Sequence, residues 1–198
     1  MEKKDLTSKD FLLALLYCPG TTMKYNEPIL GRTRLTKMVY LFEKEVYSQF
    51  ASEINITLPV FEPYHFGPFS KKLFEDLRFF ISIGFIETQE TQVPISSAEK
   101  YESDVDNDDC WECASFDEAD NDVELRYYLS ERGENYVKQK VWDVFTVMQK
   151  EGLSQYKGKI NSISLDSLLN YVYNKYPEDT TKSRIADRYI GKDDDRQC

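Results

Sequence analysis

The whole net negative charge of this 198-residue chain lies in one stretch. Between Glu99 and Glu124 there are twelve acidic residues and one basic residue, whereas the remaining residues comprise 24 basic and 23 acidic ones. The part from Tyr101 to Asp109 has neither helical nor alternating apolar spacing, and repulsion between its carboxylates favours an extended, solvated conformation. The core must therefore be built by the segments before and after this acidic insert.

Two roles are open for the acidic insert. As a solvated loop it would aid solubility, because a net charge far from zero keeps protein molecules apart. Alternatively, it would compete with nucleic acid for a basic groove or dock on a basic partner. In either case it contributes charge rather than a hydrophobic core.

The composition of the whole chain indicates a folded protein. Hydrophobic residues make up 41% and aromatic residues 14%, which is enough apolar material for a core and excludes wholesale disorder. The longest apolar run, Phe11–Tyr17, is far shorter than the roughly 20 residues that span a bilayer, and no secretory cleavage pattern is present. Four cysteines do not form a disulfide framework, so we expect a cytoplasmic protein without membrane contact.

Two amphipathic helices are predicted at the start of the chain. Thr7 is placed to cap the first, which ends at Pro19-Gly20. The second begins near Thr33, and its apolar stripe continues to Val46. The first helix has one predicted apolar face, made of Phe11, Leu12, Leu15 and Leu16. The cations near the start of the second lie away from its stripe or at its edge: Arg32, Arg34 and Lys37.

Residues 54–69 favour short extended pieces, because three prolines and a glycine forbid a long helix there. We expect a turn at Gly67-Pro68, after which Ser70 caps a third helix. Leu73, Leu77, Phe80 and Ile81 are predicted to face inward. The residues predicted to face water are Lys71, Lys72, Glu75, Asp76 and Arg78.

Two strands are predicted to flank the acidic insert. Gly84 ends the third helix, and residues 84–90 and 122–129 carry the strand-like segments, so we expect them to pair as an antiparallel hairpin. Ser130 then caps a fourth helix, whose apolar spacing continues to Met148. Gly152 and Gly158 interrupt the stretch that follows, and a last amphipathic helix runs from Ser164 to Pro177.

Three helices followed by a two-stranded hairpin is the order of a winged helix-turn-helix. We therefore predict an α+β, mainly helical fold. A winged helix-turn-helix domain occupies residues 1–150, with an acidic wing insert at 91–122. Additional C-terminal helices at 151–190 pack on this domain, and residues 191–198 form a polar tail.

Three segments carry a resemblance to a known family. They are Gly31–Glu45 (GRTRLTKMVYLFEKE), Phe61–Leu77 (FEPYHFGPFSKKLFEDL) and Leu169–Glu178 (LNYVYNKYPE). Together they resemble the YwgA-like group of bacterial and archaeal winged-helix proteins and, more distantly, the SocA-like antitoxin domain, also called Panacea. The resemblance covers most of the chain apart from the acidic insert, which departs from the family pattern. It implies the winged-helix fold, and the Panacea relationship implies neutralisation of a toxin.

Double-stranded DNA is one candidate partner, to be read by the helix at residues 70–83. The supply of cations is thin, however, because Glu75 and Asp76 share that helix with the lysines. A protein partner is therefore preferred over DNA, and a second copy of the chain is a further candidate. The candidate binding residues for either partner are Arg32, Arg34, Lys37, Tyr64, His65, Phe66, Lys71, Lys72 and Arg78.

No catalytic or cofactor site is expected. His65 is the one histidine, and its candidate nucleophiles, Ser70 and Cys18, lie in no known nucleophile motif. Cys110 and Cys113 have the spacing of half a zinc site, but the other half is missing, so they are weak metal candidates only. We expect a non-enzymatic, antitoxin-like or adaptor module in a bacterial or phage defence setting. A DNA-binding transcriptional regulator is the alternative, and a subunit of a hydrolase or nuclease is less favoured.

Overall fold

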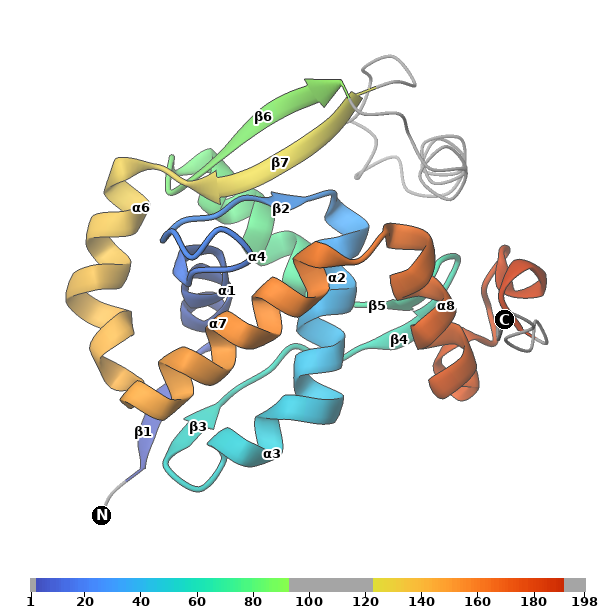
Figure 1. The fold of residues 1–198 in the computed structure, drawn as a ribbon, viewed down its shortest axis with the longest axis horizontal. Coiled ribbons are helices and arrows are strands. Elements are labelled where there is room, and N and C mark those ends of the chain that lie inside the picture. Colours follow the sequence, from blue (N-terminus) through green and yellow to red (C-terminus); the bar gives the residue numbers. More distant parts are fainter. Residues whose placement is uncertain (1–2, 93–122, 191–198) are drawn as a thin grey trace.

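The computed structural model describes residues 3–92 and 123–190, which form a mainly helical structure with three small sheets (Figure 1). The α+β class predicted from the sequence is confirmed. The acidic insert predicted at residues 91–122 falls almost entirely outside the described ranges, as do Cys110, Cys113 and the tail at 191–198.

Helices and short strands alternate along the chain. The helical elements are α1 (Ser8–Tyr17), α2 (Arg32–Leu41), η1 (Phe42–Val46), α3 (Tyr47–Phe50), α4 (Lys71–Ser82), α6 (Glu131–Tyr136), η3 (Val137–Val141), η4 (Trp142–Val144), α7 (Val147–Ser162), α8 (Leu165–Lys175), η5 (Pro177–Thr180) and η6 (Ala186–Arg188). The strands are β1 (Lys4–Leu6), β2 (Ile29–Leu30), β3 (Ile54–Ile56), β4 (Glu62–Tyr64), β5 (Gly67–Phe69), β6 (Ile86–Gln92) and β7 (Val123–Leu129). Two long helical segments, α2–η1–α3 and α6–η3–η4, each contain a π-helical stretch.

α1 is the central helix of the core. Every residue from Phe11 to Cys18 is at most 5% exposed, so the helix is buried on all sides rather than on the single face predicted from its spacing. Its start is as predicted, because Thr7 caps it and forms a capping box with Asp10. Figure 1 shows α1 in the interior, among α4, α6 and α7.

α7 is joined to the end of α1 by a buried lysine. The Nζ atom of Lys157, whose residue is 0% exposed, donates hydrogen bonds to the carbonyl oxygens of Leu16 (2.8 Å) and Cys18 (2.9 Å). A cation is favoured there because the last carbonyls of a helix are unpaired and the dipole is negative. Burial lowers the pKa of Lys157 to about 8 and raises the pKa of the Cys18 thiol to about 12. The C-terminal helices are thus bound to the core by polar as well as apolar contacts.

The hairpin expected on either side of the acidic insert is present. β6 and β7 pair antiparallel, from Ile86 opposite Leu129 to Gln92 opposite Val123. The short strand β2 joins the other side of β7, which gives a three-stranded sheet in the order β2-β7-β6. β2 has two residues, which is too short for a sequence pattern to predict.

The fourth helix predicted from Ser130 to Met148 is wrong only at its end, after Val144. Its cap at Ser130 is correct, but the helical segment ends at Val144, and Phe145 is extended. Thr146 then caps α7 in a capping box with Gln149, which leaves Met148 82% exposed. α7 continues through Gly152 and Gly158, and the expected boundary between residues 150 and 151 falls inside it.

The segment at residues 54–69 forms short strands, as predicted, but its turn is displaced. β4 and β5 pair with Tyr64 opposite Gly67, so His65 and Phe66 form the turn and Gly67-Pro68 belong to β5. Gly67 has φ +81°, and a Cβ atom there would lie 3.2 Å from the ring of Tyr173. Glycine therefore allows both the backbone conformation and the close approach of α8.

Candidate interaction surface

The predicted recognition helix, α4, is fixed by its two ends and its inner face. Ser70 caps it by accepting a hydrogen bond from the backbone N–H of Leu73, and Gly84 ends it with φ +69°. Leu73, Leu77 and Phe80 are buried, as predicted from their spacing. The outer face of α4 is therefore held in one orientation relative to the core.

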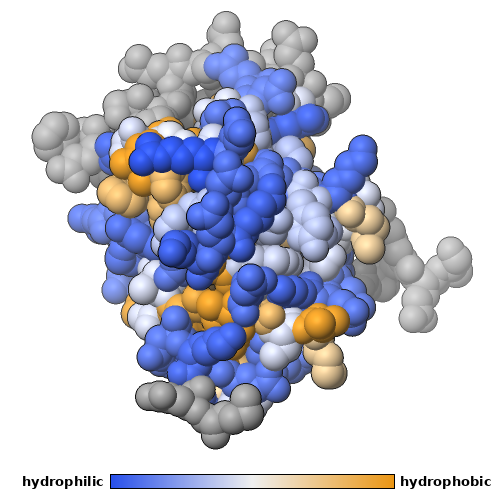
Figure 2. Space-filling view, turned by 90° about the vertical axis from the view of Figure 1, so that its left-hand side faces the viewer, coloured by the Kyte–Doolittle hydropathy of each residue, from blue (hydrophilic) through white to orange (hydrophobic). Residues whose placement is uncertain are grey.

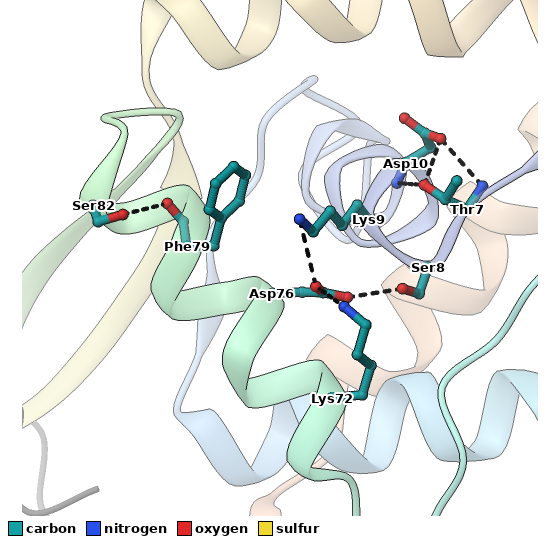
Figure 3. A network of polar contacts seen from close by, with 8 residues as sticks. All are labelled: Thr7, Ser8, Lys9, Asp10, Lys72, Asp76, Phe79 and Ser82. Atoms are coloured by element: carbon teal, nitrogen blue, oxygen red, sulfur yellow. Dashed lines mark hydrogen bonds and ion pairs between the residues drawn. The ribbon is translucent and has the colours of Figure 1, made fainter. Parts of the chain in front are cut away.

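One residue of that outer face is not on the surface at all. Asp76, which was expected to face water, is 1% exposed and lies where α4 meets the start of α1 (Figure 3). Its Oδ2 atom accepts a hydrogen bond of 2.8 Å from the hydroxyl of Ser8, in the first turn of α1. Its Oδ1 atom accepts from Lys72 and lies 4.0 Å from Nζ of Lys9. Asp76 therefore joins α4 to α1.

Two cations meet one carboxylate in the contacts of Asp76. The single carboxylate of Asp76 is shared by two ammonium groups, those of Lys9 and Lys72, whose side chains are 39% and 52% exposed. Lys9 also places its Nζ atom 3.9 Å from the centre of the Phe79 ring, a cation–π contact (Figure 3). The junction thus presents a positive charge directly beside an aromatic ring.

A row of aromatic rings leads from α4 to α6. The ring centres of Phe79 and Phe80 are 5.3 Å apart, those of Phe80 and Phe85 are 5.8 Å apart, and those of Phe85 and Tyr136 are 5.4 Å apart. Phe79 is 43% exposed and Tyr136 is 37% exposed. A second cation, Arg132, lies over the Phe85 ring at 4.9 Å.

We call this group the α4–α6 surface, and it consists of Lys9, Lys72, Phe79, Phe85, Arg132 and Tyr136. α6 is on the left of Figure 1, and that side faces the viewer in Figure 2, where hydrophobic areas remain uncovered next to a hydrophilic band. Exposed aromatic rings with cations beside them are typical of binding surfaces rather than of a solvated helix face.

Two of the predicted binding cations are buried, so their assignment as phosphate contacts is wrong. Arg34 is 7% exposed, and its Nη1 atom donates hydrogen bonds of 2.7 Å to the carbonyls of Ile160 and Ile163, at the end of α7. Lys37 is 2% exposed and donates from Nζ to the carbonyls of Phe66 and Pro68, in the β4–β5 hairpin. Both are used to satisfy backbone carbonyls of distant elements.

The remaining predicted residues fall into two groups. Arg32, Tyr64, His65 and Phe66 are half-buried near the β4–β5 hairpin, whereas Lys71, Lys72 and Arg78 are exposed on α4. In the first group the rings of His65, Tyr64, Phe69 and Phe74 follow one another at 4.3, 4.9 and 4.7 Å, and Arg32 lies 5.0 Å from the Phe74 centre. The carbonyl of His65 accepts hydrogen bonds from the backbone of Arg184 and the hydroxyl of Ser183, so the C-terminal segment holds this hairpin in place.

Most residues of the α4–α6 surface are not predicted by the sequence pattern. Phe79 is on the same helix as Leu73 and Leu77 but lies off their apolar stripe. An aromatic residue outside the apolar stripe of a helix is the sequence signal that indicates a binding residue here. Lys9, Arg132 and Tyr136 come from elements far from α4 in the sequence. Their approach to α4 depends on the tertiary packing.

Three further observations bear on the function. Among residues 3–92 and 123–190, no group of three His, Cys, Asp or Glu side chains is placed to hold a metal ion. No helix in these ranges combines the length and the apolar character needed to cross a membrane. Comparisons with protein-family models, with curated proteins and with solved structures give no match for the chain.

Removal of the Asp76 carboxylate tests the junction between α1 and α4. The Asp76→Ala variant is expected to lower the free energy of unfolding by about 2 kcal/mol, because a buried hydrogen-bonded charge is lost and its partners are left unpaired. The Lys72→Met variant is expected to lower it by less than about 1 kcal/mol, because the lysine is half exposed. Urea unfolding of both variants checks this, and equal losses would show that Asp76 does not act as the link.

Proposed function

We propose that the chain is a non-enzymatic winged-helix binding module that acts through protein–protein contacts, as an adaptor or an antitoxin-like subunit. Support comes from the order of α1, α2 and α4 followed by the β6–β7 hairpin, with β2 paired to β7. The resemblance of residues 31–45 and 61–77 to the YwgA-like and Panacea families agrees with this order. The same resemblance makes a toxin in a bacterial or phage defence system the class of partner to be tried first.

The observation that carries the proposal is the use that the fold makes of its cations. Six cations were candidates for DNA contacts, but Arg34 and Lys37 are buried in the fold and Lys72 is paired with Asp76. At most three of these six therefore remain to contact phosphates, and the affinity for DNA grows with the number of phosphates neutralised. Exposed Phe79 and Tyr136, in contrast, offer apolar contacts that a protein partner can bury.

The test compares the two kinds of partner directly. The full chain is mixed with labelled double-stranded DNA over a range of salt concentrations, and it is co-expressed with the products of neighbouring genes. We expect a stable complex with a protein partner on size exclusion. For DNA we expect weak binding, and the slope of the logarithm of the binding constant against the logarithm of the salt concentration should correspond to no more than about three phosphates, at about 0.9 per phosphate.

The opposite result would favour the alternative, a DNA-binding transcriptional regulator that uses α4. Tight DNA binding at physiological salt, lost in the Lys71→Glu and Arg78→Glu variants, would overturn the protein-binding proposal.

A further inference from the structure

We propose that the α4–α6 surface binds an acidic segment of the partner protein, in which carboxylates flank an apolar or aromatic anchor residue. This inference rests on the proposed function and specifies the chemistry of the partner. Three features of the surface support it: the distribution of charge, the exposed rings, and the rigid packing beneath them.

The charge distribution favours carboxylates. Lys9 and Lys72 share one carboxylate, and the contacts of Arg132 within the described residues are to neutral groups, namely the Ile83 carbonyl at 3.1 Å and the Phe85 ring. The nearby carboxylates of Asp10 and Glu131 lie in the first turns of α1 and α6, where the helix dipoles offset part of their charge. Asp10 also accepts hydrogen bonds from Thr7 and, at 3.4 Å, from the hydroxyl of Tyr136. An incoming carboxylate can therefore pair with Lys9, or with Arg132 without displacing another carboxylate from it.

The exposed rings favour an apolar anchor between those carboxylates. Phe79 and Tyr136 keep 43% and 37% of their surface accessible. Phe79 packs on Phe80, which belongs to the core, and Tyr136 packs on Phe85, which lies against the core. Because a cation lies over Phe79 and another over Phe85, an anchor that packs on these rings brings its neighbouring carboxylates close to the cations. Double-stranded DNA fits this surface less well than such a segment does, because no exposed apolar group accompanies its phosphates.

The surface is preformed. Phe80 is 5% exposed and lies between the rings of Phe79 and Phe85. The buried carboxylate of Asp76 contacts the ammonium groups of both Lys9 and Lys72. The hydroxyl of Ser130 donates to the Gly84 carbonyl, which holds the start of α6 against the end of α4. Little ordering is therefore required when a partner binds, and this favours affinity.

A synthetic peptide tests the chemistry without the natural partner. The probe is a fluorescein-labelled amphipathic peptide that alternates glutamates with leucine and phenylalanine, and its binding to the full chain is followed by anisotropy. One control peptide carries lysine in place of glutamate, and another carries serine in place of the apolar residues. We expect the first peptide to bind, with an affinity that falls as salt is added, and both controls to bind at least about tenfold more weakly.

Variants of the full chain locate the binding. Lys9→Glu, Arg132→Glu and Phe79→Ala should each weaken binding of the acidic peptide at least about tenfold. The matched controls are Lys182→Glu, an exposed lysine of the C-terminal segment, and Tyr171→Ala, a 40% exposed aromatic residue on α8. Both should bind as the unmodified chain does. Circular dichroism and urea unfolding establish that each variant is folded.

Several results would overturn the inference. The charge preference would be wrong if the lysine peptide bound as tightly as the glutamate peptide, or if oligothymidylate at equal concentration displaced the glutamate peptide. The location would be wrong if the three surface variants bound the glutamate peptide as the unmodified chain does. The inference as a whole would fail if the glutamate peptide did not bind at its highest soluble concentration. The same variants separate this inference from the proposed function. If the complex with a neighbouring gene product survives all three substitutions, the surface is wrong but the protein-binding function stands; if no such complex exists, the function itself fails.

Discussion

Substitution of Gly133 by alanine should lower the free energy of unfolding by about 3 kcal/mol or more. Gly133 is buried in α6, and a Cβ atom there would lie 2.2 Å from the carbonyl oxygen of Phe85. That oxygen also accepts a hydrogen bond from the backbone N–H of Ser130, so α6 cannot move away from β6 without loss of this bond. The neighbouring atoms are backbone, and they cannot relax as a flexible side chain would.

Gly152→Ala provides the matched control. Gly152 also lies within a helix, α7, but a Cβ atom there would meet only the Phe50 ring, at 3.8 Å, which is an ordinary contact. Helix propensity alone predicts that both substitutions stabilise the protein by about 0.5–1 kcal/mol. Urea unfolding should therefore give opposite signs for the two variants. A Gly133→Ala protein as stable as the Gly152→Ala protein would show that α6 does not approach β6 as closely as described.

The features that could be predicted from the sequence are those decided by neighbouring residues. The caps predicted at Thr7, Ser70 and Ser130 are correct, because a cap depends on a side-chain oxygen and backbone N–H groups two or three residues away. The β6–β7 hairpin was also predictable, although its strands are far apart in the chain, because both show strand-like composition next to clear helix boundaries. The capping box of Thr146 and Gln149 was equally local, but the apolar spacing up to Met148 outweighed it.

The positions of the polar residues could not be predicted, because their partners are distant in the chain. Arg34 bonds to carbonyls that lie 126 and 129 residues further on, and Asp76 bonds to Ser8, 68 residues before it. A charged residue next to an apolar stripe is usually solvated, and a sequence gives no sign that a backbone carbonyl will meet it. This is why two of the predicted binding cations, Arg34 and Lys37, are buried, whereas most of the predicted helices and strands are present.

The burial of these cations has a consequence for the function. Arg34 and Lys37, which the sequence pattern assigns to ligand binding, instead join helices and a hairpin through backbone carbonyls, as the buried Lys157 also does. Charge that is used inside the fold cannot attract a polyanion from solution. The cations at the α4–α6 surface differ, because Lys9 and Arg132 keep exposed positions beside aromatic rings.

A second large loss of stability is expected when the carboxylate of Glu27 is removed. Glu27 is 8% exposed and holds the loop between α1 and β2. It accepts hydrogen bonds from the backbone N–H groups of Thr21 (2.9 Å) and Thr22 (2.5 Å), and from the Asn161 amide (2.9 Å). The Thr22 hydroxyl donates a further bond, at 2.6 Å. The Glu27→Gln variant places an amide N–H group among these donors, so at neutral pH its free energy of unfolding should fall by about 2–3 kcal/mol.

The same carboxylate predicts how stability depends on pH. Burial alone would raise the pKa of Glu27, but the hydrogen bonds from Thr22, Asn161 and the backbone outweigh it and lower the pKa from 4.5 to about 2. Between these values the unfolded chain binds more protons than the folded one, so the contribution of Glu27 is complete above about pH 4.5 and is lost as the pH falls towards 2. The lost contribution amounts to about 3 kcal/mol, since one unit of pKa corresponds to about 1.4 kcal/mol.

Urea unfolding of the unmodified chain and of Glu27→Gln, from neutral pH down to the acid limit of folding, measures this contribution. The two stabilities should differ most at neutral pH and converge as the pH falls, because the unmodified chain then loses the carboxylate by protonation. Glu53→Gln, at an exposed position, should follow the unmodified chain throughout. If the difference in the free energy of unfolding between Glu27→Gln and the unmodified chain stays constant with pH, the carboxylate does not hold the loop through its charge. The link between α1 and the β2-β7-β6 sheet would then depend on the hydrogen bonds of Asn26 with the backbone of Leu129.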